Sequence, residues 1–345
     1  MKVLHLLQSN RFSGAENVVC QIINMMKKYP EYEMVYCSAD GQIREALQER
    51  GIRFVPMQKL CTKEVRRVLK QEKPDIVHAH DMGASFYAAL VCGKTKLISH
   101  IHNNAFDSRG ISLKSIAYLS AAWKARQIFW VSRSAFEGYK FRKWFERKSS
   151  VLYNIINIDA LYQRMQQDEK EYPYAVVFLG RLTYPKNPQR MIRVLAKVVE
   201  QKPDVKIAVI GQGELGEETK ALCSKLKLDS NVSFLGFQSN PLKILHDAKV
   251  MLMTSRWEGL PMCVLESLAL GVPIVSTPTD GVKERLEEGK SGFLSDDDDV
   301  LARRILQVLS DASLQTQMSA YAKEKSLEIN DTEIYCNCLV EAYNK

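Results

Sequence analysis

The segment 257–266, WEGLPMCVLE, holds the residue pattern best suited to chemistry. If a helix begins near Pro261, its first backbone N–H groups have no partner within the helix and can hold phosphate or sugar oxygens. Glu258 precedes this helix and Glu266 lies one or two turns into it. A carboxylate in so apolar a stretch is costly unless it has partners. We therefore expect Glu258 to accept hydrogen bonds from hydroxyls, and Glu266 to bind a ribose.

Two cations follow an earlier apolar run. Arg181 comes directly after the segment 178–180, FLG, and Lys186 follows in the segment 183–188, TYPKNP. An arginine fork and a lysine point charge on one loop at the end of a strand suit a diphosphate. The alternative is that they only keep the surface soluble, although surface cations rarely follow a buried strand directly.

Glycines mark two further turns. Gly14 lies between the first apolar run and a helical stretch, where backbone N–H groups could approach a phosphate. A purely structural turn fits Gly14 equally well, and no G-x-G-x-x-G dinucleotide fingerprint is present there. Gly211 and Gly213, in the sequence GQG, are weak signals by themselves.

Four histidines alternate at two predicted strand ends, His78 with His80 and His100 with His102. Alternate positions of a strand point the same way, so convergence on a metal is conceivable. We identify no carboxylate or thiol partners for such a site. The favoured arrangement places His102 in a cleft, with His78 and His80 on a neighbouring strand end near an acceptor. His5 and His246 are interpreted as structural.

The region Phe136–Lys148, FEGYKFRKWFERK, interleaves aromatic and cationic residues. At helical spacing Phe141, Trp144 and Phe145 share one face and the cations lie elsewhere, the pattern of an interfacial helix on an anionic membrane. An ordinary helix with core aromatics is the alternative. Single-stranded nucleic acid would also suit basic and aromatic residues, but nothing else in the chain resembles a nucleic-acid module.

The elements that must position these residues alternate between short apolar runs and amphipathic stretches, as in parallel α/β sheets. The predicted strands fall into two series, 2–7, 33–37, 75–78, 96–100 and 128–131, and then 175–178, 206–210, 232–234, 250–253 and 273–276. The polar stretch 157–174 is the predicted linker, and 301–345 is predicted to be helical. The acidic run 296–299 is interpreted as a solvated loop and helix start.

Length, charge and cysteine content bound the class of protein. The chain has 345 residues, enough for two domains. Residues 1–150 carry 25 Lys and Arg against 13 Asp and Glu, whereas the remainder carries 23 against 27. A basic first half suggests an anionic partner there. The eight cysteines are mostly scattered singly, and no apolar run reaches the roughly 18 residues of a membrane span. We therefore expect a reduced, cytoplasmic chain.

These motifs together resemble the retaining nucleotide-sugar glycosyltransferases of family 4 (group 1), over essentially the whole chain. The resemblance is carried by Ser13-Gly14-Ala15-Glu16, His102-Asn103, Gly180-Arg181-Leu182, Lys186-Asn187-Pro188, Gly211-Gln212-Gly213 and Glu258-Gly259-Leu260-Pro261 through Glu266. It implies the α/β GT-B fold, in which two Rossmann-like, doubly wound parallel-sheet domains face an interdomain cleft. The implied domains are 1–160 for the acceptor, 171–325 for the donor, and a C-terminal helix at 326–345 that packs back toward the first.

The resemblance also implies roles for individual residues. Arg181 and Lys186 would neutralise the donor diphosphate, Glu258 would hold the transferred sugar and Glu266 the ribose, while His102 would face the sugar from the first domain. The remaining implied donor or nucleotide contacts are Gly14, Gly211, Gly213, Phe237, Gly259, Leu260 and Pro261. Ser13 stands where many relatives have a second glycine, which leaves the first loop's approach to the donor open. No metal or other cofactor is implied.

The expected function is therefore retaining, metal-independent transfer from a nucleotide sugar, with UDP favoured, to a glycan or polyprenyl-linked acceptor in surface polysaccharide synthesis. The expected location is the inner face of the cell membrane, contacted through Phe136–Lys148, with no nucleic-acid partner. Two alternatives remain open: a nucleotide-sugar epimerase on the same fold, and a binding protein for nucleotide sugars or glycans without turnover.

Overall fold

The computed structural model describes residues 1–103 and 109–345, which form two units. Unit 1 comprises Met1–Ile155 with Asp331–Lys345, and unit 2 comprises Ile156–Asn330. These bounds differ by a few residues from the expected domains 1–160, 171–325 and 326–345. The predicted linker 157–174 is wrong in part, because it contains the helix α7 (Ile158–Gln166), which belongs to unit 2. Position 326 lies within the helix α14 (Ala312–Ile329), also in unit 2.

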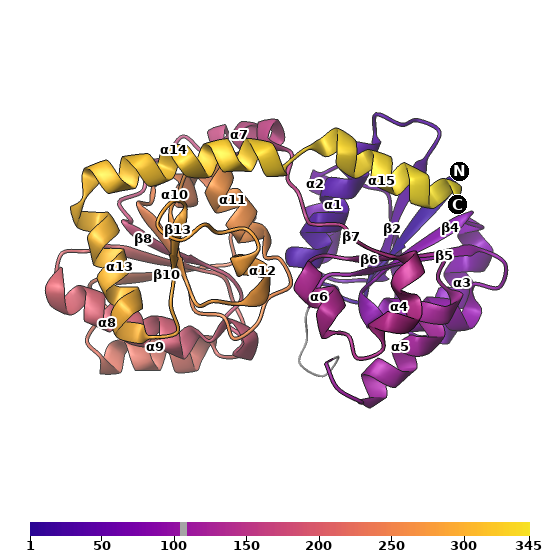
Figure 1. Ribbon diagram of the computed structural model, residues 1–345, viewed down its shortest axis with the longest axis horizontal. Coiled ribbons are helices and arrows are strands. Elements are labelled where there is room, and N and C mark those ends of the chain that lie inside the picture. Colours follow the sequence, from indigo (N-terminus) through magenta and orange to yellow (C-terminus); the bar gives the residue numbers. More distant parts are fainter. Residues whose placement is uncertain (104–108) are drawn as a thin grey trace. The chain divides into compact units, whose positions relative to one another are not determined.

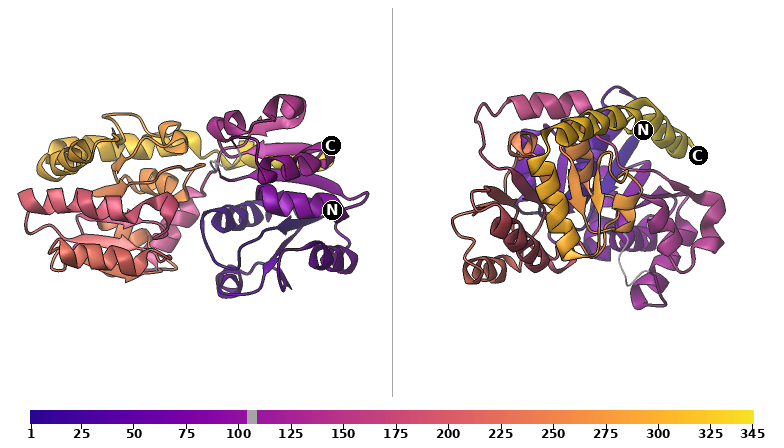
Figure 2. Two further views of the ribbon diagram at one scale, coloured as in Figure 1. Left: turned by 90° about the horizontal axis from the view of Figure 1, so that it is seen from below. Right: turned by 60° about the vertical axis from the view of Figure 1, so that its left-hand side comes forward.

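Unit 1 contains a seven-stranded parallel sheet in the order β3-β2-β1-β4-β5-β6-β7, with helices on both of its faces (Figure 2). Its strands are β1 (Lys2–Leu6), β2 (Glu33–Ala39), β3 (Phe54–Met57), β4 (Ile76–His80), β5 (Lys96–Ile101), β6 (Gln127–Trp130) and β7 (Ser149–Val151). Its helices are α1 (Gly14–Met26), α2 (Ile43–Glu49), α3 (Thr62–Glu72), α4 (Asp81–Val91), α5 (Leu113–Lys124), α6 (Arg133–Gly138), the 3-10 helix η2 (Arg142–Lys148) and α15 (Thr332–Asn344).

Unit 2 contains a six-stranded parallel sheet in the order β10-β9-β8-β11-β12-β13. Its strands are β8 (Val176–Leu179), β9 (Ile207–Ile210), β10 (Val232–Gly236), β11 (Val250–Met253), β12 (Ile274–Ser276) and β13 (Gly292–Leu294). Besides α7 and α14, its helices are the 3-10 helix η3 (Tyr184–Lys186), α8 (Pro188–Gln201), α9 (Gly216–Lys225), α10 (Leu242–Asp247), α11 (Met262–Leu270), α12 (Asp280–Lys283) and α13 (Asp298–Ser310). The expected pair of doubly wound, parallel α/β sheets is confirmed.

Continuous apolar runs form the central strands, because a parallel strand is covered by helices on both faces. Every residue of β4 and of β11 is buried. All ten predicted strands are present, with bounds shifted by at most a few residues. The prediction missed β3, β7 and β13, which are edge strands of three or four residues. Short edge strands carry little apolar signal, and β3 also contains Pro56, which edge strands tolerate.

Each sheet has a point at which the strand order reverses. In unit 2 the chain proceeds from β8 to β9 on one side and later places β11 on the other side of β8. In unit 1 the corresponding point lies between β1 and β4. Ligands of doubly wound sheets bind beyond the carboxyl ends of the strands at such points. The loops after β8 and β11 are therefore the first place to examine in unit 2.

The C-terminal 45 residues are helical, as predicted. Figure 1 shows α14 lying along unit 2, where it contacts α11, and α15 lying along unit 1, where it contacts α1. Within unit 1, the hydroxyl of Tyr343 on α15 is 2.9 Å from Nδ1 of His78 in the core of the sheet. Among the described residues, no helix is both long enough and apolar enough to cross a bilayer.

Candidate functional site

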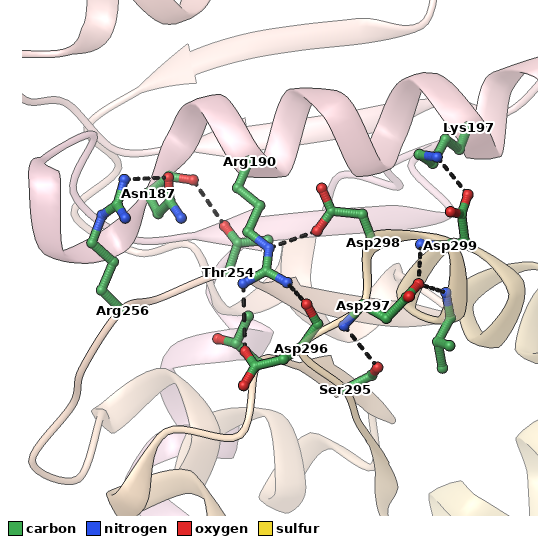
Figure 3. Close-up of polar contacts among 12 residues, drawn as sticks. Asn187, Arg190, Lys197, Thr254, Arg256, Ser295, Asp296, Asp297, Asp298 and Asp299 are labelled. Atoms are coloured by element: carbon green, nitrogen blue, oxygen red, sulfur yellow. Dashed lines mark hydrogen bonds and ion pairs between the residues drawn. The ribbon is translucent and has the colours of Figure 1, made fainter.

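The loops that follow β8 and β11 are joined by a set of hydrogen bonds. The backbone N–H of Arg256 donates to the carbonyl of Pro185 at 2.7 Å, and its guanidinium donates to Asn187 Oδ1 at 3.1 Å. The hydroxyl of Thr254 donates to the carbonyl of Asn187 at 3.1 Å. Figure 3 shows Arg256 and Thr254 on either side of Asn187. Asn187 has a left-handed backbone (φ 54°), which asparagine tolerates, and Pro188 begins α8.

This junction brings Lys186 and Glu258 into contact. Nζ of Lys186 donates to Oε1 of Glu258 at 2.5 Å, and the same oxygen accepts from the hydroxyl of Ser255 at 2.6 Å. The two charged side chains are only 16% and 12% exposed. Burial acts to lower the pKa of Lys186, but the charge of Glu258 and its hydrogen bond to Lys186 oppose burial, so that this pKa lies above its ordinary value. Lys186 is therefore a permanent cation that keeps N–H donors for a further anion.

Cys263, the second residue of α11 (Met262–Leu270), lies near Glu266, and Lys186 lies near Arg181. The buried thiol of Cys263 senses the charges of Lys186, Glu258 and Glu266, and burial with the two carboxylates raises its pKa to about 12 although Lys186 opposes the shift. Arg181, which is exposed, lies close enough to Lys186 to act against its protonation. The four charged groups predicted from sequence, Arg181, Lys186, Glu258 and Glu266, thus lie in one neighbourhood of unit 2.

The helix α11 begins as predicted, with Pro261 as its N-cap and Met262 as its first residue. Every residue of α11 is buried except Glu266, which is partly exposed. Gly259, in the turn before the helix, packs its carbonyl against Gly281, where a Cβ atom would lie 1.6 Å from that oxygen. Gly281 belongs to α12, which sequence analysis did not connect with the site. It fixes the path of the Gly259–Pro261 backbone.

Gly211 and Gly213, which follow β9, lie so close to backbone carbonyls that a side chain would not fit at either position. A Cβ atom at Gly211 would lie 2.0 Å from the carbonyl of Gly180, and one at Gly213 would lie 2.2 Å from that of Leu182. Gly211 also has φ +133°, a conformation that side chains rarely adopt. Its N–H donates to Gly236 at 2.7 Å, which places Phe237, 52% exposed, beside this loop. An exposed aromatic ring at a strand end offers a stacking surface.

In unit 1, Gly14 lies at the first residue of α1, at the predicted strand-to-helix turn. A Cβ atom there would meet nothing within 4 Å, so packing does not require glycine. The hydroxyl of Ser13 donates to the buried carboxylate of Glu16 at 2.5 Å, which makes this serine part of the helix start.

His102 follows β5 and is 9% exposed. Its Nε2 lies 2.8 Å from Nδ1 of His80, and its backbone N–H donates to Asp81 Oδ1 at 2.9 Å. Burial lowers the pKa of His102, opposed by the charge of Asp81. Asp81 itself has φ 67°, an unusual backbone for aspartate that commonly marks functional sites. His5, expected to be structural, also contacts this group, with Nδ1 at 3.0 Å from His80 Nε2.

The expectation of a single interfacial helix over Phe136–Lys148 is wrong. The segment divides into the short α6, a turn and the 3-10 helix η2. Phe145 and Tyr139 are buried, whereas Trp144 is 62% exposed, so Phe141, Trp144 and Phe145 do not share one face. Phe145 is 1% exposed, and its ring packs edge-on against the exposed ring of Trp123 on α5, with the centroids 5.3 Å apart.

The acidic run 296–299 is the predicted helix start. Oδ1 of Asp297 accepts from the backbone N–H groups of Asp299 and Val300 at 2.8 and 3.0 Å, which caps α13. Arg190 on α8 binds Asp298, with Nε to Oδ1 at 2.6 Å. Figure 3 shows both interactions, together with the ion pair between Lys197 and Asp299. These carboxylates are engaged in holding α8 and α13 together.

Several residues of these sites were missed from sequence, namely Ser255, Arg256, Gly281, Asp81 and Met34, the last of which has its Sδ 3.4 Å from Nε2 of His5. Ser255 and Arg256 precede Glu258 within the same segment, so proximity in sequence could have suggested them. Gly281 and Met34 lie far along the chain from their partners and carry no such signal.

Two family models match the chain over almost its whole length. "Glycosyltransferase Family 4" matches residues 12–160 and "Glycosyl transferases group 1" matches residues 162–325. The first match thus lies in the half that contains Gly14 and His102, and the second contains all four charged groups of unit 2.

The chain is also similar to individual glycosyltransferases and to solved structures. An uncharacterized glycosyltransferase of Methanocaldococcus jannaschii is 30% identical over 63% of this chain and 58% of its own length. An N-acetylgalactosaminyltransferase of Campylobacter jejuni, named for a diphospho-undecaprenol-linked acceptor, is 28% identical over 54% of this chain and 52% of its own. The chain thus spans little more than half the length of these relatives. The crystal structure of Anabaena HepE with UDP and glucose has a TM-score of 0.86 and 21% identity, covering 100% of this chain and 99% of HepE, which shows the GT-B fold.

Proposed function

Since the chain belongs to the group 1 glycosyltransferases of GT-B fold, we propose that it transfers a sugar from a nucleotide-sugar donor to a glycan or polyprenyl-linked acceptor. The observation that carries this proposal is the Lys186–Glu258 contact at the strand-order reversal of unit 2, with Arg181 and Glu266 close by. One anionic and one cationic group side by side suit a donor that carries both a sugar and a diphosphate.

Each group has a distinct task in the proposed reaction. Lys186 and Arg181 stabilise the negative charge that develops on the leaving diphosphate. Lys186 can do so while keeping Glu258, because an ammonium has three donors and the carboxylate occupies one. Glu258, held by Lys186 and Ser255, is oriented to accept hydrogen bonds from hydroxyls of the transferred sugar. Glu266 binds the ribose, and the N-terminal N–H groups of α11 bind donor oxygens.

We propose that the reaction retains the configuration at the anomeric carbon and needs no metal. The bond from the anomeric carbon to the leaving phosphate oxygen breaks, and the bond to the acceptor oxygen forms on the same face. The acceptor proton passes to the leaving phosphate, so that no enzyme nucleophile is required. We assign Glu258 a binding role instead, since Lys186 and Ser255 both hold its Oε1 and Oε2 can accept from a sugar hydroxyl. The cations perform the charge neutralisation that a divalent metal would otherwise supply.

UDP is the favoured nucleotide. The structural relative HepE was crystallised with UDP and glucose. In this chain the exposed Phe237 and the neighbouring backbone of Gly236 and Gln238 provide a surface that can hold a base through stacking and main-chain hydrogen bonds. The polyprenyl-linked acceptor is supported by the name of the Campylobacter relative.

An exposed apolar surface in unit 1 supports contact with an anionic membrane. Leu113, Ile116 and Trp123 follow one another along one face of α5 and are 89%, 48% and 66% exposed. Trp144 of η2 extends this surface, since Lys148 donates to the carbonyl of Trp123 at 2.9 Å and so holds η2 beside α5. The exposed cations around it are Lys114, Lys124, Arg126, Lys143 and Arg147. Apolar side chains ringed by cations suit an anionic leaflet, which would place the protein at the cytoplasmic face of the membrane.

Vesicle flotation tests this surface. Replacing Lys124, Lys143 and Arg147 by glutamine removes three exposed cations worth about 1 kcal/mol each near an anionic surface, so binding to phosphatidylglycerol vesicles should weaken roughly a hundredfold. Trp123→Ser should weaken it as well. Leu327→Ser, which removes a 68% exposed leucine from unit 2, is the matched control. Unchanged flotation of the first two variants would refute the proposed surface.

A thermal-shift panel of nucleotide sugars, followed by product analysis, tests the function. A donor that binds the folded state raises its melting temperature, and with an acceptor present it should yield a new glycosidic product of retained configuration. An epimerase would convert the donor without any acceptor. A pure binding protein would show the shift and release no nucleotide. Either result, or no shift with any nucleotide sugar, would overturn the proposal.

A further inference from the structure

Five histidines of unit 1 lie together on three adjacent strands of the sheet. The sheet register pairs His5 of β1 with His78 of β4, and His80 of β4 with His100 of β5, while His102 follows two residues after His100. Because alternate residues of a strand share a face, the five rings gather on one side of the sheet. Neighbouring rings stack, for example His78 on His80 with the centroids 4.4 Å apart.

Three of these rings form a continuous hydrogen-bonded chain that ends on a methionine. Nδ1 of His5 lies 3.0 Å from Nε2 of His80, and Nδ1 of His80 lies 2.8 Å from Nε2 of His102. At the inner end, Nε2 of His5 lies 3.4 Å from Sδ of Met34. Side-chain exposure rises along the chain, from 0% at His5 through 2% at His80 to 9% at His102. The chain therefore leads from the core toward the surface.

All three rings are neutral near pH 7. Burial lowers the pKa of His5 to about 3 and the pKa of His80 well below its ordinary value. The pKa of His102 is also lowered by burial. A neutral imidazole carries one N–H donor and one acceptor nitrogen, so each ring–ring contact must have one donor and one acceptor. Only two arrangements of the whole chain satisfy this rule, and they run in opposite directions.

The methionine selects one of the two. A thioether sulfur can accept a hydrogen bond but has no hydrogen to donate, so the contact with Met34 requires the proton on Nε2 of His5. Nδ1 of His5 is then an acceptor, which puts the proton of His80 on Nε2. By the same step Nδ1 of His80 accepts, and the proton of His102 lies on Nε2. Nδ1 of His102 is left with a lone pair; this atom is buried, and among the described residues it has no hydrogen-bond partner.

We propose that Met34, His5 and His80 are positioning residues that hold His102 in the Nε2–H form, so that Nδ1 of His102 accepts a hydrogen bond from a hydroxyl group of the substrate. The ligand atom at this point is therefore a donor, such as a sugar hydroxyl, and a carbonyl or phosphate oxygen is excluded. That assignment to a sugar rests on the proposed function, whereas the direction of the chain does not. The stacked His78 and His100 keep the rings in place by packing.

Nitrogen NMR on the whole protein, labelled with ¹⁵N-histidine and without substrate, reads the direction of the chain. Long-range ¹⁵N–¹H correlation distinguishes protonated from unprotonated ring nitrogens, and single His→Gln variants assign the signals. We expect Nε2 to be protonated and Nδ1 to be unprotonated in His5, His80 and His102. Met34→Leu removes the sulfur acceptor and should introduce the Nδ1–H form at His102, whereas the control Met57→Leu, at another buried methionine of unit 1, should not.

Donor kinetics then test the substrate contact. His80→Phe keeps a ring in place but breaks both hydrogen bonds, and it should lower kcat/KM by roughly tenfold, the size of one buried hydrogen bond. Among donors and acceptors that each lack one hydroxyl, one should lose its sensitivity to His80→Phe because its contact with His102 is already missing. Equal sensitivity of all deoxy substrates would overturn the substrate contact.

The NMR result also distinguishes a failure of the proposed histidine chain from a failure of the proposed function. A protonated Nδ1 at His102, or signals shifted by stoichiometric Zn²⁺ bound to the five rings, would overturn the proposed chain whether or not the enzyme is active. A correct chain in a protein that binds no nucleotide sugar would instead refute the proposed function and with it the sugar contact.

Discussion

The Lys186→Met substitution separates the structural from the catalytic part of the Lys186–Glu258 pair. Methionine keeps the aliphatic stem that packs near Gly180, but it leaves the carboxylate of Glu258, 12% exposed, without its cation. Breaking a buried ion pair by removing one partner costs about 3–5 kcal/mol. Because Ser255 still donates to Glu258 at 2.6 Å, we expect the lower figure. For a unit of the size of Ile156–Asn330, about 3 kcal/mol corresponds to a fall in Tm of roughly 6–12 °C.

The effect on transfer should be larger than the effect on folding. In the proposed reaction Lys186 donates to the leaving diphosphate, and removing one such preorganised donor typically costs about 10²–10³ in kcat. The double variant Lys186→Met with Glu258→Gln replaces the broken pair by two neutral groups. It should recover much of the lost stability because no buried charge is left unpaired. It should recover none of the activity.

Differential scanning fluorimetry and initial-rate assays on folded protein, below the variant Tm, measure the two effects. Transfer at the wild-type rate by Lys186→Met would show that the pair only stabilises unit 2. Recovery of both stability and activity in the double variant would lead to the same conclusion.

Three further predictions concern pH, packing and metal. Burial lowers the pKa values of His5, His78, His80 and His100, so below about pH 6.5 the unfolded chain binds protons that folded unit 1 does not. The free energy of unfolding should therefore fall by up to about 1.4 kcal/mol per pH unit for each histidine. Tryptophan fluorescence of unit 1 in a Trp257→Phe variant measures this, and an unfolding free energy independent of pH between 6.5 and 5 would contradict it. Gly281→Ala places a Cβ atom 1.6 Å from the carbonyl of Gly259, so it should displace the turn before α11 and abolish the donor-induced thermal shift, whereas Gly110→Ala, with open space around its Cβ and no positive φ, should preserve it; donor binding by the first variant would refute the packing argument. A chelator should leave transfer unchanged, and a loss of activity restored by a divalent metal would show that the cations are insufficient.

Much of the fold and part of the site were predictable because they depend on local patterns. Strands that are buried on both faces must be apolar throughout, so the nine internal strands of the two described sheets were recognised, together with the edge strand β10. The cation and carboxylate pattern was recognisable because loops at the ends of adjacent parallel strands meet at one sheet edge. The other three edge strands, β3, β7 and β13, were missed, since a strand of three or four residues at a sheet edge has no distinctive composition.

By itself the sequence determined two parallel α/β units, the start of α11 near Pro261, and the identity of the four charged groups in unit 2. Tertiary structure alone decided that Ser255 shares Glu258 with Lys186, that Phe145 packs into the core while Trp144 remains exposed, and that Met34 terminates a chain of histidines. These facts depend on distances between side chains from separate strands and loops. Residue types and spacing fix the direction of a side chain along its own element, but the neighbours that it meets are set only when the elements pack.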